Sequence, residues 1–197
     1  MPFALTSLIK KTEEDKELLN QILSSFSCEL DKDIENFLQN KAVQFEELSK
    51  ARTYLICSQK QVESENFCLD QLNIYGYFSL ALKVLSIPDD FSNRKRMEID
   101  GLSAKIYGKP INDFPCYLIG QLAKNSNIDI NAISGDELLQ SALNIISNAV
   151  KAVGGRYVMI ECHNNDKLIN FYKRNGFVKI SNVFDKDNEM LQMIRKI

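Results

Sequence analysis

The stretch Arg156–Ile180 constrains the fold more than any other part of the chain, because it holds a strand, a helix and a second strand in close succession. The apolar run Tyr157–Ile160 is typical of a buried strand. Asn164 and Asn165 can cap a short helix, and Asn175–Gly176 supplies the signal that ends it. The apolar run Phe177–Ile180 then resumes a strand. The stretch therefore predicts one compact β-α-β-like unit.

One face of this short helix differs from an ordinary core stripe. Asn165, Leu168 and Tyr172 are spaced i, i+3 and i+7, so they share a face. That face joins an amide, an apolar side chain and a phenol. The combination suits the wall of a binding site.

A longer helix is predicted after Ser134. Ser134 at the N-cap and Glu137 three residues later form a capping box, and Gly154–Gly155 ends the helix. Its core face consists of Leu138, Leu139, Ala142, Leu143, Ile146 and Val150. The polar loop Asn125–Ile133 precedes this helix, so the backbone N–H groups of Ser134, Gly135 and Asp136 are candidates for binding a phosphate.

Hydrophobic periodicity predicts the other elements. Two amphipathic helices are expected, one from an N-cap at Thr12 to Phe26 and one from about Asp31 to Leu48. The expected strands are Arg52–Ser58, Asn73–Ile87, Ser103–Tyr107, Tyr117–Ala123 and Met190–Ile194. Within the second of these strands, Gly76 marks a bulge or a close approach of two backbones.

Two linking segments carry turn and charged residues. Gln59–Gln71 is predicted as a long hairpin loop, and Pro88–Asp100 as a loop that either covers a substrate site or, as we prefer, lies on the surface. Arg94-Lys95-Arg96 and Lys173-Arg174 are candidate basic patches, which we interpret as solvated faces. No repeat or linker divides the chain, so residues 1–197 are predicted to form a single domain.

Composition argues against several classes of protein. The chain is 25% charged and 45% hydrophobic, a composition that suits a globular domain. We expect neither a membrane-spanning segment nor a secretion signal. Five cysteines at wide spacings predict reduced thiols in a cytoplasm. His163 is the only histidine, so we expect neither a metal site nor a Ser-His-Asp triad. The net charge of −2 provides no general attraction to nucleic acid.

Asn165, Leu168, Tyr172, Gly176 and Phe177 together resemble a motif of the GNAT acyltransferase superfamily, Asn-x-x-Ala-x-x-x-Tyr-x-x-x-Gly-Phe, with leucine in place of the usual alanine. The predicted order of helices and strands also resembles that of GNAT enzymes over nearly the whole chain. The resemblance implies an α/β (α+β) fold, with one GNAT-like domain whose central mixed, mostly antiparallel sheet is flanked by helices.

Three further stretches are similar to the GNAT branch that includes the toxin acetyltransferases of toxin–antitoxin pairs. They are Phe26–Ala42, Thr53–Ser58 followed by Tyr75–Ala81, and Gln121–Asn125. This similarity makes an aminoacyl-tRNA one candidate acceptor and an antitoxin-like protein one candidate partner. A homodimer is the alternative assembly. The slightly acidic charge sets the chain apart from such toxins, whose tRNA substrate favours basic surfaces.

The loop before the long helix departs from the superfamily. GNAT enzymes bind the pyrophosphate of coenzyme A there with a loop patterned Gln/Arg-x-x-Gly-x-Gly/Ala. The last glycine corresponds to Gly135, but the earlier one falls on Ile133 and the Gln/Arg on Ile130. Asp136 and Glu137 add carboxylates that repel a phosphate, although exposed charges interact weakly in water. The resemblance still implies acetyl-CoA as co-substrate, bound at this helix start.

The resemblance also implies the reaction, which is direct transfer of an acetyl group from acetyl-CoA to a primary amine through a tetrahedral intermediate. The pantetheine arm would pair with Leu122, Ala123 and Lys124 like an added strand. The backbone N–H of Ala123 or Lys124 would stabilise the thioester oxygen as it gains charge.

Side chains would carry the proton transfers. By resemblance, Tyr172 would protonate the departing thiolate, and Asn165 would bond the cofactor or fix the start of its helix. Glu161 is our leading candidate for the base that takes the proton of the amine. Tyr117 or Asp113, acting through water, are the alternatives.

Two classes of function remain open. The first is an active N-acyltransferase whose acceptor is an amine on a small molecule, a protein or an aminoacyl-tRNA, the last being the acceptor of a toxin. The second is a non-catalytic GNAT-like module that binds CoA or a protein partner, which the altered phosphate loop favours.

Overall fold

The computed structural model describes residues 2–57, 69, 72–129, 131–185 and 188–197, which form two compact units. Unit 1 comprises Met1–Ala81 and Ile119–Asn148, and unit 2 comprises Leu82–Leu118 and Ala149–Ile197. Three long elements contribute to both units: strands β3 (Ile74–Ser86) and β6 (Asp113–Lys124) and helix α7 (Gly135–Val153). The loop predicted over Gln59–Gln71 lies almost wholly outside the described residues.

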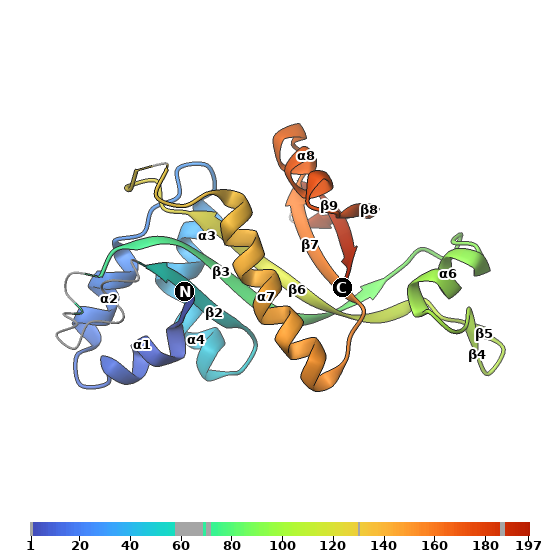
Figure 1. The fold of residues 1–197 in the computed structure, drawn as a ribbon, viewed down its shortest axis with the longest axis horizontal. Helices are drawn as coiled ribbons and strands as arrows, with labels where there is room; N and C mark the ends of the chain where they lie inside the picture. The colour runs from blue at the N-terminus through green and yellow to red at the C-terminus, as the bar shows by residue number, and fades with distance from the viewer. Residues whose placement is uncertain (1, 58–68, 70–71, 130, 186–187) are drawn as a thin grey trace. The chain divides into compact units, whose positions relative to one another are not determined.

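Unit 1 combines antiparallel strands with the short helices of the first part of the chain (Figure 1). Its strand order is β1-β2-β3-β6, where β1 is Pro2–Ala4 and β2 is Arg52–Cys57. Leu55 sets the register, because it pairs with Phe3 on one side and with Tyr77 on the other. The helices are α1 (Leu5–Lys11), α2 (Lys16–Ser24), α3 (Lys32–Asn36), a π-helical turn η1 (Phe37–Lys41) and α4 (Ala42–Glu47).

The core of unit 1 joins these helices to β2 and β3. Its fully buried side chains include Leu5, Leu8, Phe26, Leu38, Leu55, Ile74 and Tyr77. The rings of Phe26 and Tyr77 meet edge to face with their centroids 5.0 Å apart. Each large apolar side chain buried in this way contributes about 1.5–3 kcal/mol. Tertiary packing therefore stabilises helices that are too short to persist alone.

The first helical region differs from the prediction. Thr12 does not begin a helix but ends α1, since its hydroxyl donates to the Leu8 carbonyl at 2.9 Å. The N-cap of α2 is Asp15, whose carboxylate accepts from the Leu18 N–H at 2.9 Å. Thr12 is only 2% exposed. The prediction was wrong because several adjacent polar residues match the signal of an N-cap. The fold buries Thr12 at the end of α1 and leaves Asp15 as the N-cap of α2.

Gly76 lies at a close approach of two backbones, as predicted. The register between β2 and β3 shifts beside it, which leaves Tyr75 as the extra residue of a bulge. A Cβ on Gly76 would lie 2.8 Å from the Ala123 carbonyl oxygen and 3.5 Å from the Leu138 side chain. Only glycine fits here without a shift of β6.

Unit 2 contains the outer strands and helices α6 and α8. Its strand order is β3-β6-β7-β9-β8, and β9 pairs antiparallel with both β7 and β8. The bounds are β7 Tyr157–His163, β8 Val178–Asp185, β9 Asn188–Lys196, α6 Asn93–Asp100, α8 Asp166–Arg174, and β4 Lys105–Ile106 with β5 Lys109–Pro110. The core of this unit includes Leu85, Ile99, Phe114, Tyr157, Met159 and Ile194.

The segment predicted as a surface loop, Pro88–Asp100, instead contains helix α6, with Ser92 as its N-cap. Arg96 is 3% exposed. Its guanidinium donates to the Asn112 side chain at 2.9 Å and to the Asp89 carbonyl at 2.9 Å, so the charge is held inside the unit. The prediction of a solvated basic face is therefore wrong for Arg96.

Candidate functional site

The predicted site residues lie in both compact units. Unit 1 holds Leu122, Ala123, Lys124, Ser134, Gly135 and Asp136, and unit 2 holds Glu161, Asn165 and Tyr172. Local structure within each unit positions its own group.

Tyr172 is a buried phenol on α8. It is 8% exposed, and its ring packs edge to face against Phe171 and Phe177, with centroid distances of 5.0 and 5.5 Å. Burial raises the pKa of Tyr172 above its ordinary value of 10.0, and the charge of Cys162 adds to the shift. Among the described residues, the hydroxyl has no hydrogen-bond partner. A neutral phenol of this kind can donate a proton at neutral pH.

The predicted start and end of α8 are both confirmed. Asn165 is the N-cap, and its side-chain oxygen accepts from the Lys167 N–H at 2.9 Å. Gly176 follows the helix with φ of +81°, a left-handed conformation that favours glycine. Leu168, on the face shared by Asn165 and Tyr172, is 38% exposed. The face thus runs from an exposed amide to a buried phenol.

Glu161 lies on β7 with both carboxylate oxygens engaged. Lys83 donates to them at 2.8 and 2.7 Å, and the Gln192 amide donates to Oε1 at 2.9 Å. A base must offer a lone pair to the amine, so Glu161 would have to exchange one of these bonds to act as one. Neither partner was selected from the sequence, because Lys83 and Gln192 are distant along the chain.

The two alternative bases are also bonded within unit 2. The Tyr117 hydroxyl donates to the Gly154 carbonyl at 2.5 Å, and its ring covers Gly155 so closely that a Cβ there would collide with it. Asp113 accepts from the Ser86 hydroxyl at 2.6 Å. Both side chains are therefore already hydrogen-bonded to other residues of the same unit.

The carboxyl end of β6 follows a fixed path in unit 1. Ala123 is 9% exposed, and its carbonyl oxygen lies against Gly76. Two residues after Ala123, the backbone N–H of Asn125 donates to the Tyr75 carbonyl at 2.9 Å. The segment proposed to pair with pantetheine is thus held beside β3.

The start of α7 contains the predicted capping box. The Glu137 carboxylate accepts from the Ser134 N–H at 2.8 Å and from its hydroxyl at 2.7 Å, and the Glu137 N–H donates to Ser134 Oγ at 3.1 Å. These bonds lower the pKa of Glu137, with the Ser134 hydroxyl as the largest cause. The helix therefore satisfies some of its own N-terminal donors before any phosphate arrives.

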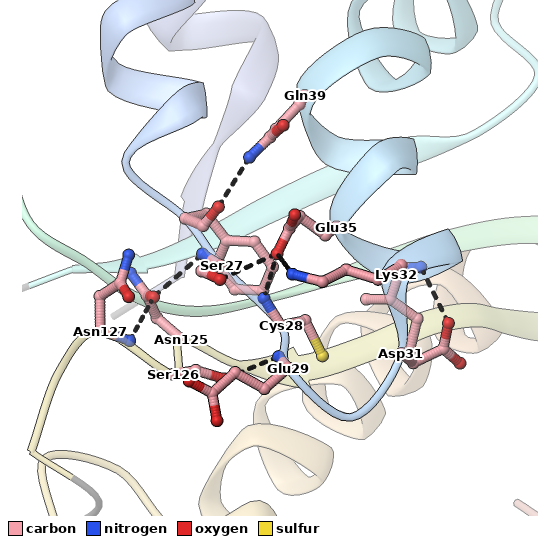
Figure 2. A network of polar contacts seen from close by, with 12 residues as sticks. Ser27, Cys28, Glu29, Asp31, Lys32, Glu35, Gln39, Asn125, Ser126 and Asn127 are labelled. Atoms are coloured by element: carbon pink, nitrogen blue, oxygen red, sulfur yellow. Dashed lines mark hydrogen bonds and ion pairs between the residues drawn. The ribbon is translucent and has the colours of Figure 1, made fainter.

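A polar network at the end of β6 was missed from the sequence. Figure 2 shows Asn125 and Ser126 bonded to the Ser27–Glu29 backbone, on the loop that precedes α3. Asn125 is 6% exposed. An asparagine after a strand gave a weak local signal, and its partners lie about a hundred positions earlier in the chain.

Thiols and metal ligands do not add a second site in the described part of the chain. Cys28, Cys57, Cys116 and Cys162 are free and buried, and burial raises the pKa of Cys57 to about 12 and that of Cys116 to about 11. The described residues contain no cluster of three or more His, Cys, Asp or Glu side chains suited to a metal ion. Within the same ranges, no helix has the length and apolar character needed to cross a membrane.

Comparison with known proteins identifies solved structures of similar fold. No protein-family model and no curated protein matches the chain. A tyrosine-to-phenylalanine mutant of KacT is 20% identical, covering 86% of this chain and 85% of that chain, with a TM-score of 0.59. AtaT complexed with acetyl-methionyl-tRNA is 22% identical, covering 86% and 85% of the two chains, with a TM-score of 0.58.

A third structure is a tyrosine-to-phenylalanine mutant of the toxin AtaT, bound to the C-terminus of the antitoxin AtaR and acetyl-CoA. It is 19% identical, covering 88% of this chain and 84% of that chain, with a TM-score of 0.55. At such identities the likeness shows the fold. It confirms the predicted fold class, a GNAT-like arrangement of helices around a mostly antiparallel sheet.

Proposed function

We propose that this chain, as one domain over residues 1–197, is an N-acyltransferase that uses acetyl-CoA to acetylate a primary amine. The observation that carries the proposal is Tyr172, a buried neutral phenol on a helix capped by Asn165, within a GNAT-like fold. Acetyl-CoA, when bound, supplies a thioester whose carbonyl carbon accepts the amine. The residues of the chain would hold that thioester, take the proton of the amine and protonate the departing thiolate.

The residues present suit this group at two places. The end of β6 offers a backbone held in place beside Gly76, where the N–H of Ala123 or Lys124 would stabilise negative charge on the thioester oxygen. Tyr172 would protonate the departing thiolate, because its phenol is protonated at neutral pH. Leu122 would extend the strand edge for the pantetheine arm.

The pyrophosphate would be held at the start of α7 by Ser134, Gly135 and Asp136. Glu137 competes for the Ser134 donors, so binding would require the carboxylate to turn away. The side chain is exposed, so water would solvate the released carboxylate. Asn165 would bond the cofactor or fix the helix start, and Glu161 would take the proton of the amine after leaving Lys83.

The acceptor would be an amine on a small molecule, a protein or an aminoacyl-tRNA. The structure of AtaT with acetyl-methionyl-tRNA supports the last of these, and the AtaR complex supports an antitoxin-like partner. A homodimer is a further expected assembly. Free, buried cysteines suit a reducing cytoplasm, where we place the protein.

A second candidate function is a GNAT-like module that binds CoA or a protein partner without catalysis. The observation that favours it is the closed capping box, together with buried Ile133 at a position where GNAT enzymes carry glycine.

Thermal unfolding with acetyl-CoA, CoA or ATP tests the binding step. A ligand at a hundred times its Kd stabilises a protein by roughly 2.7 kcal/mol, which shifts the Tm by several degrees. We expect a shift with both CoA species and none with ATP. No shift with acetyl-CoA would exclude the proposed function.

Transfer of labelled acetyl groups then separates the two candidates. An amine panel, including peptides and charged tRNA, should yield at least one acetylated acceptor. Binding of acetyl-CoA without transfer to any of them would favour the non-catalytic module. Labelling of charged tRNA, with growth arrest on expression, would identify the toxin subtype.

A further inference from the structure

Asn125 stands out in unit 1 as a buried side-chain amide with every hydrogen-bonding position used. Its oxygen accepts from the Ser27 N–H at 3.1 Å and from the Asn127 N–H at 3.0 Å. Its nitrogen donates to the Ile74 carbonyl at 2.8 Å and to the Ser25 carbonyl at 3.3 Å. A side-chain amide has two donor and two acceptor positions, so this one is saturated. One residue therefore joins the ends of β3 and β6 to the loop after α2.

Backbone contacts reinforce the same junction. The Ser126 N–H donates to the Ser27 carbonyl at 2.8 Å, and the Glu29 N–H donates to the Ser126 hydroxyl at 3.0 Å (Figure 2). The Asn125 N–H donates to the Tyr75 carbonyl at 2.9 Å. Asn125 and Ser126, which follow β6, are therefore bonded both to β3 and to the loop after α2.

The loop is also held from the helix side. Glu35 accepts from the Cys28 N–H at 2.7 Å, the Ser27 hydroxyl at 2.9 Å and Lys32 at 2.9 Å, all on one carboxylate oxygen. Gln39 donates to the Phe26 carbonyl at 2.8 Å. These contacts order the loop without touching β6, which provides an internal control for the contribution of Asn125.

The strand end that Asn125 fixes is the one assigned to the thioester oxygen. Ala123 and Lys124 directly precede Asn125, and the Ala123 carbonyl already lies against Gly76. Donors that stabilise developing charge must be aimed before the reaction, and a displacement of about 1 Å can cost about a hundredfold in rate.

We propose that Asn125 is a positioning residue for acyl transfer, which holds the backbone N–H groups of Ala123 and Lys124 in place through its bonds to Ser27 and Ile74. The inference rests on the proposed function. A purely structural role would stabilise the fold without affecting the chemical step.

Three variants separate these roles. Asn125→Ala removes all four side-chain bonds, and Ser126→Ala removes only the bond to the Glu29 N–H. Gln39→Ala is the matched control, since it loosens the same loop but leaves Asn125 untouched. The measurements are kcat and KM for acetyl-CoA, the Tm, and hydrogen exchange of the amides of residues 122–126.

Asn125→Ala should lower kcat by about ten- to a hundredfold, with less than about a threefold change in KM for acetyl-CoA and with faster exchange at the end of β6. Ser126→Ala should show a smaller fall in the same direction, and it decides the question if Asn125→Ala does not fold. Gln39→Ala should lower the Tm and leave kcat unchanged.

Unchanged kcat in the folded Asn125 and Ser126 variants, despite faster exchange, would overturn the inference. A fall in kcat that Gln39→Ala reproduces would also overturn it, because general loosening of the loop would then explain the effect. If the wild-type protein fails to bind acetyl-CoA, the proposed function fails first, and the wild-type measurement alone reveals it.

Discussion

Helices α7 and α8 both begin with a capped turn, yet they leave different groups free. At α7 the acidic side chain of Glu137 folds back onto Ser134 and occupies its N–H and hydroxyl. At α8 the neutral amide of Asn165 caps the helix, and Tyr172 two turns later keeps its hydroxyl free of partners among the described residues. The comparison shows one helix that leaves a candidate proton donor available and another whose own side chain partly occupies the N–H and hydroxyl donors at its start.

The largest expected effect is on the α8 side. Tyr172→Phe removes the proposed proton donor while keeping the ring that packs against Phe177, so kcat should fall by about a hundredfold or more with the fold intact. Steady-state acetylation of whichever acceptor is found measures this. Tyr157→Phe is the matched control, because it makes the same change at a buried tyrosine whose hydroxyl already contacts the Glu98 carbonyl. Equal activity in both variants would remove Tyr172 from the mechanism.

The cap of α8 should have the next largest effect. Asn165→Ala removes the bond to the Lys167 N–H and should lower the free energy of unfolding by about 1 kcal/mol. Urea denaturation measures the loss, and Asn165→Asp should restore most of it because a carboxylate also caps well. If Asn165→Asp restores stability but not acetyl-CoA affinity, the amide contacts the cofactor as well as the helix.

At α7 the expected change is a gain. Glu137→Ala frees the Ser134 N–H and hydroxyl, so CoA should bind about two- to threefold more tightly although the helix loses its capping box. Calorimetric titration of CoA measures this. Glu137→Gln separates the two causes, since glutamine can keep the box while losing the charge. Equal gains in both variants would show that charge, and not donor occupancy, limits binding.

The smallest expected effect is a pH dependence of stability at the same turn. The folded-state pKa of Glu137 is lowered from its ordinary value of 4.5, chiefly by the Ser134 hydroxyl. Its ionised form therefore adds stability above pH 4.5 that is lost as the pH falls through the folded pKa. The stability difference between wild type and Glu137→Gln should be constant from pH 7 to 5 and shrink below that range. A difference that does not shrink at all as the pH falls below 4.5 would contradict the assignment.

The same two helices show how much of the structure could be predicted from the sequence. Caps and stops are local, so Ser134 with Glu137, Asn165 and Gly176 mark helix boundaries that the structure confirms. The prediction at Thr12 was wrong because neighbouring polar residues matched the same signal. Thr12 is buried at the end of α1, and Asp15 is the N-cap instead.

Contacts between distant segments could not be predicted in this way. Arg96 looked like a solvated charge, but it is buried on Asn112 and two carbonyl groups. Asn125 looked like a loop residue, although it is saturated by partners at Ser25, Ser27 and Ile74. Nothing in the local pattern of either residue identifies the partner, because the fold alone brings the two segments together.

The bond between Asn125 and Ser27 also has a consequence for the order of events during synthesis. The two residues are 98 positions apart. At about 5–20 residues per second, the ribosome adds that much chain in roughly 5–20 s. Throughout that interval the α2–α3 loop lacks the Asn125 amide that later joins it to the end of β6. The proposed catalytic strand end is therefore completed late in biogenesis, and a nascent chain released before β6 would carry the helices without the junction they later support.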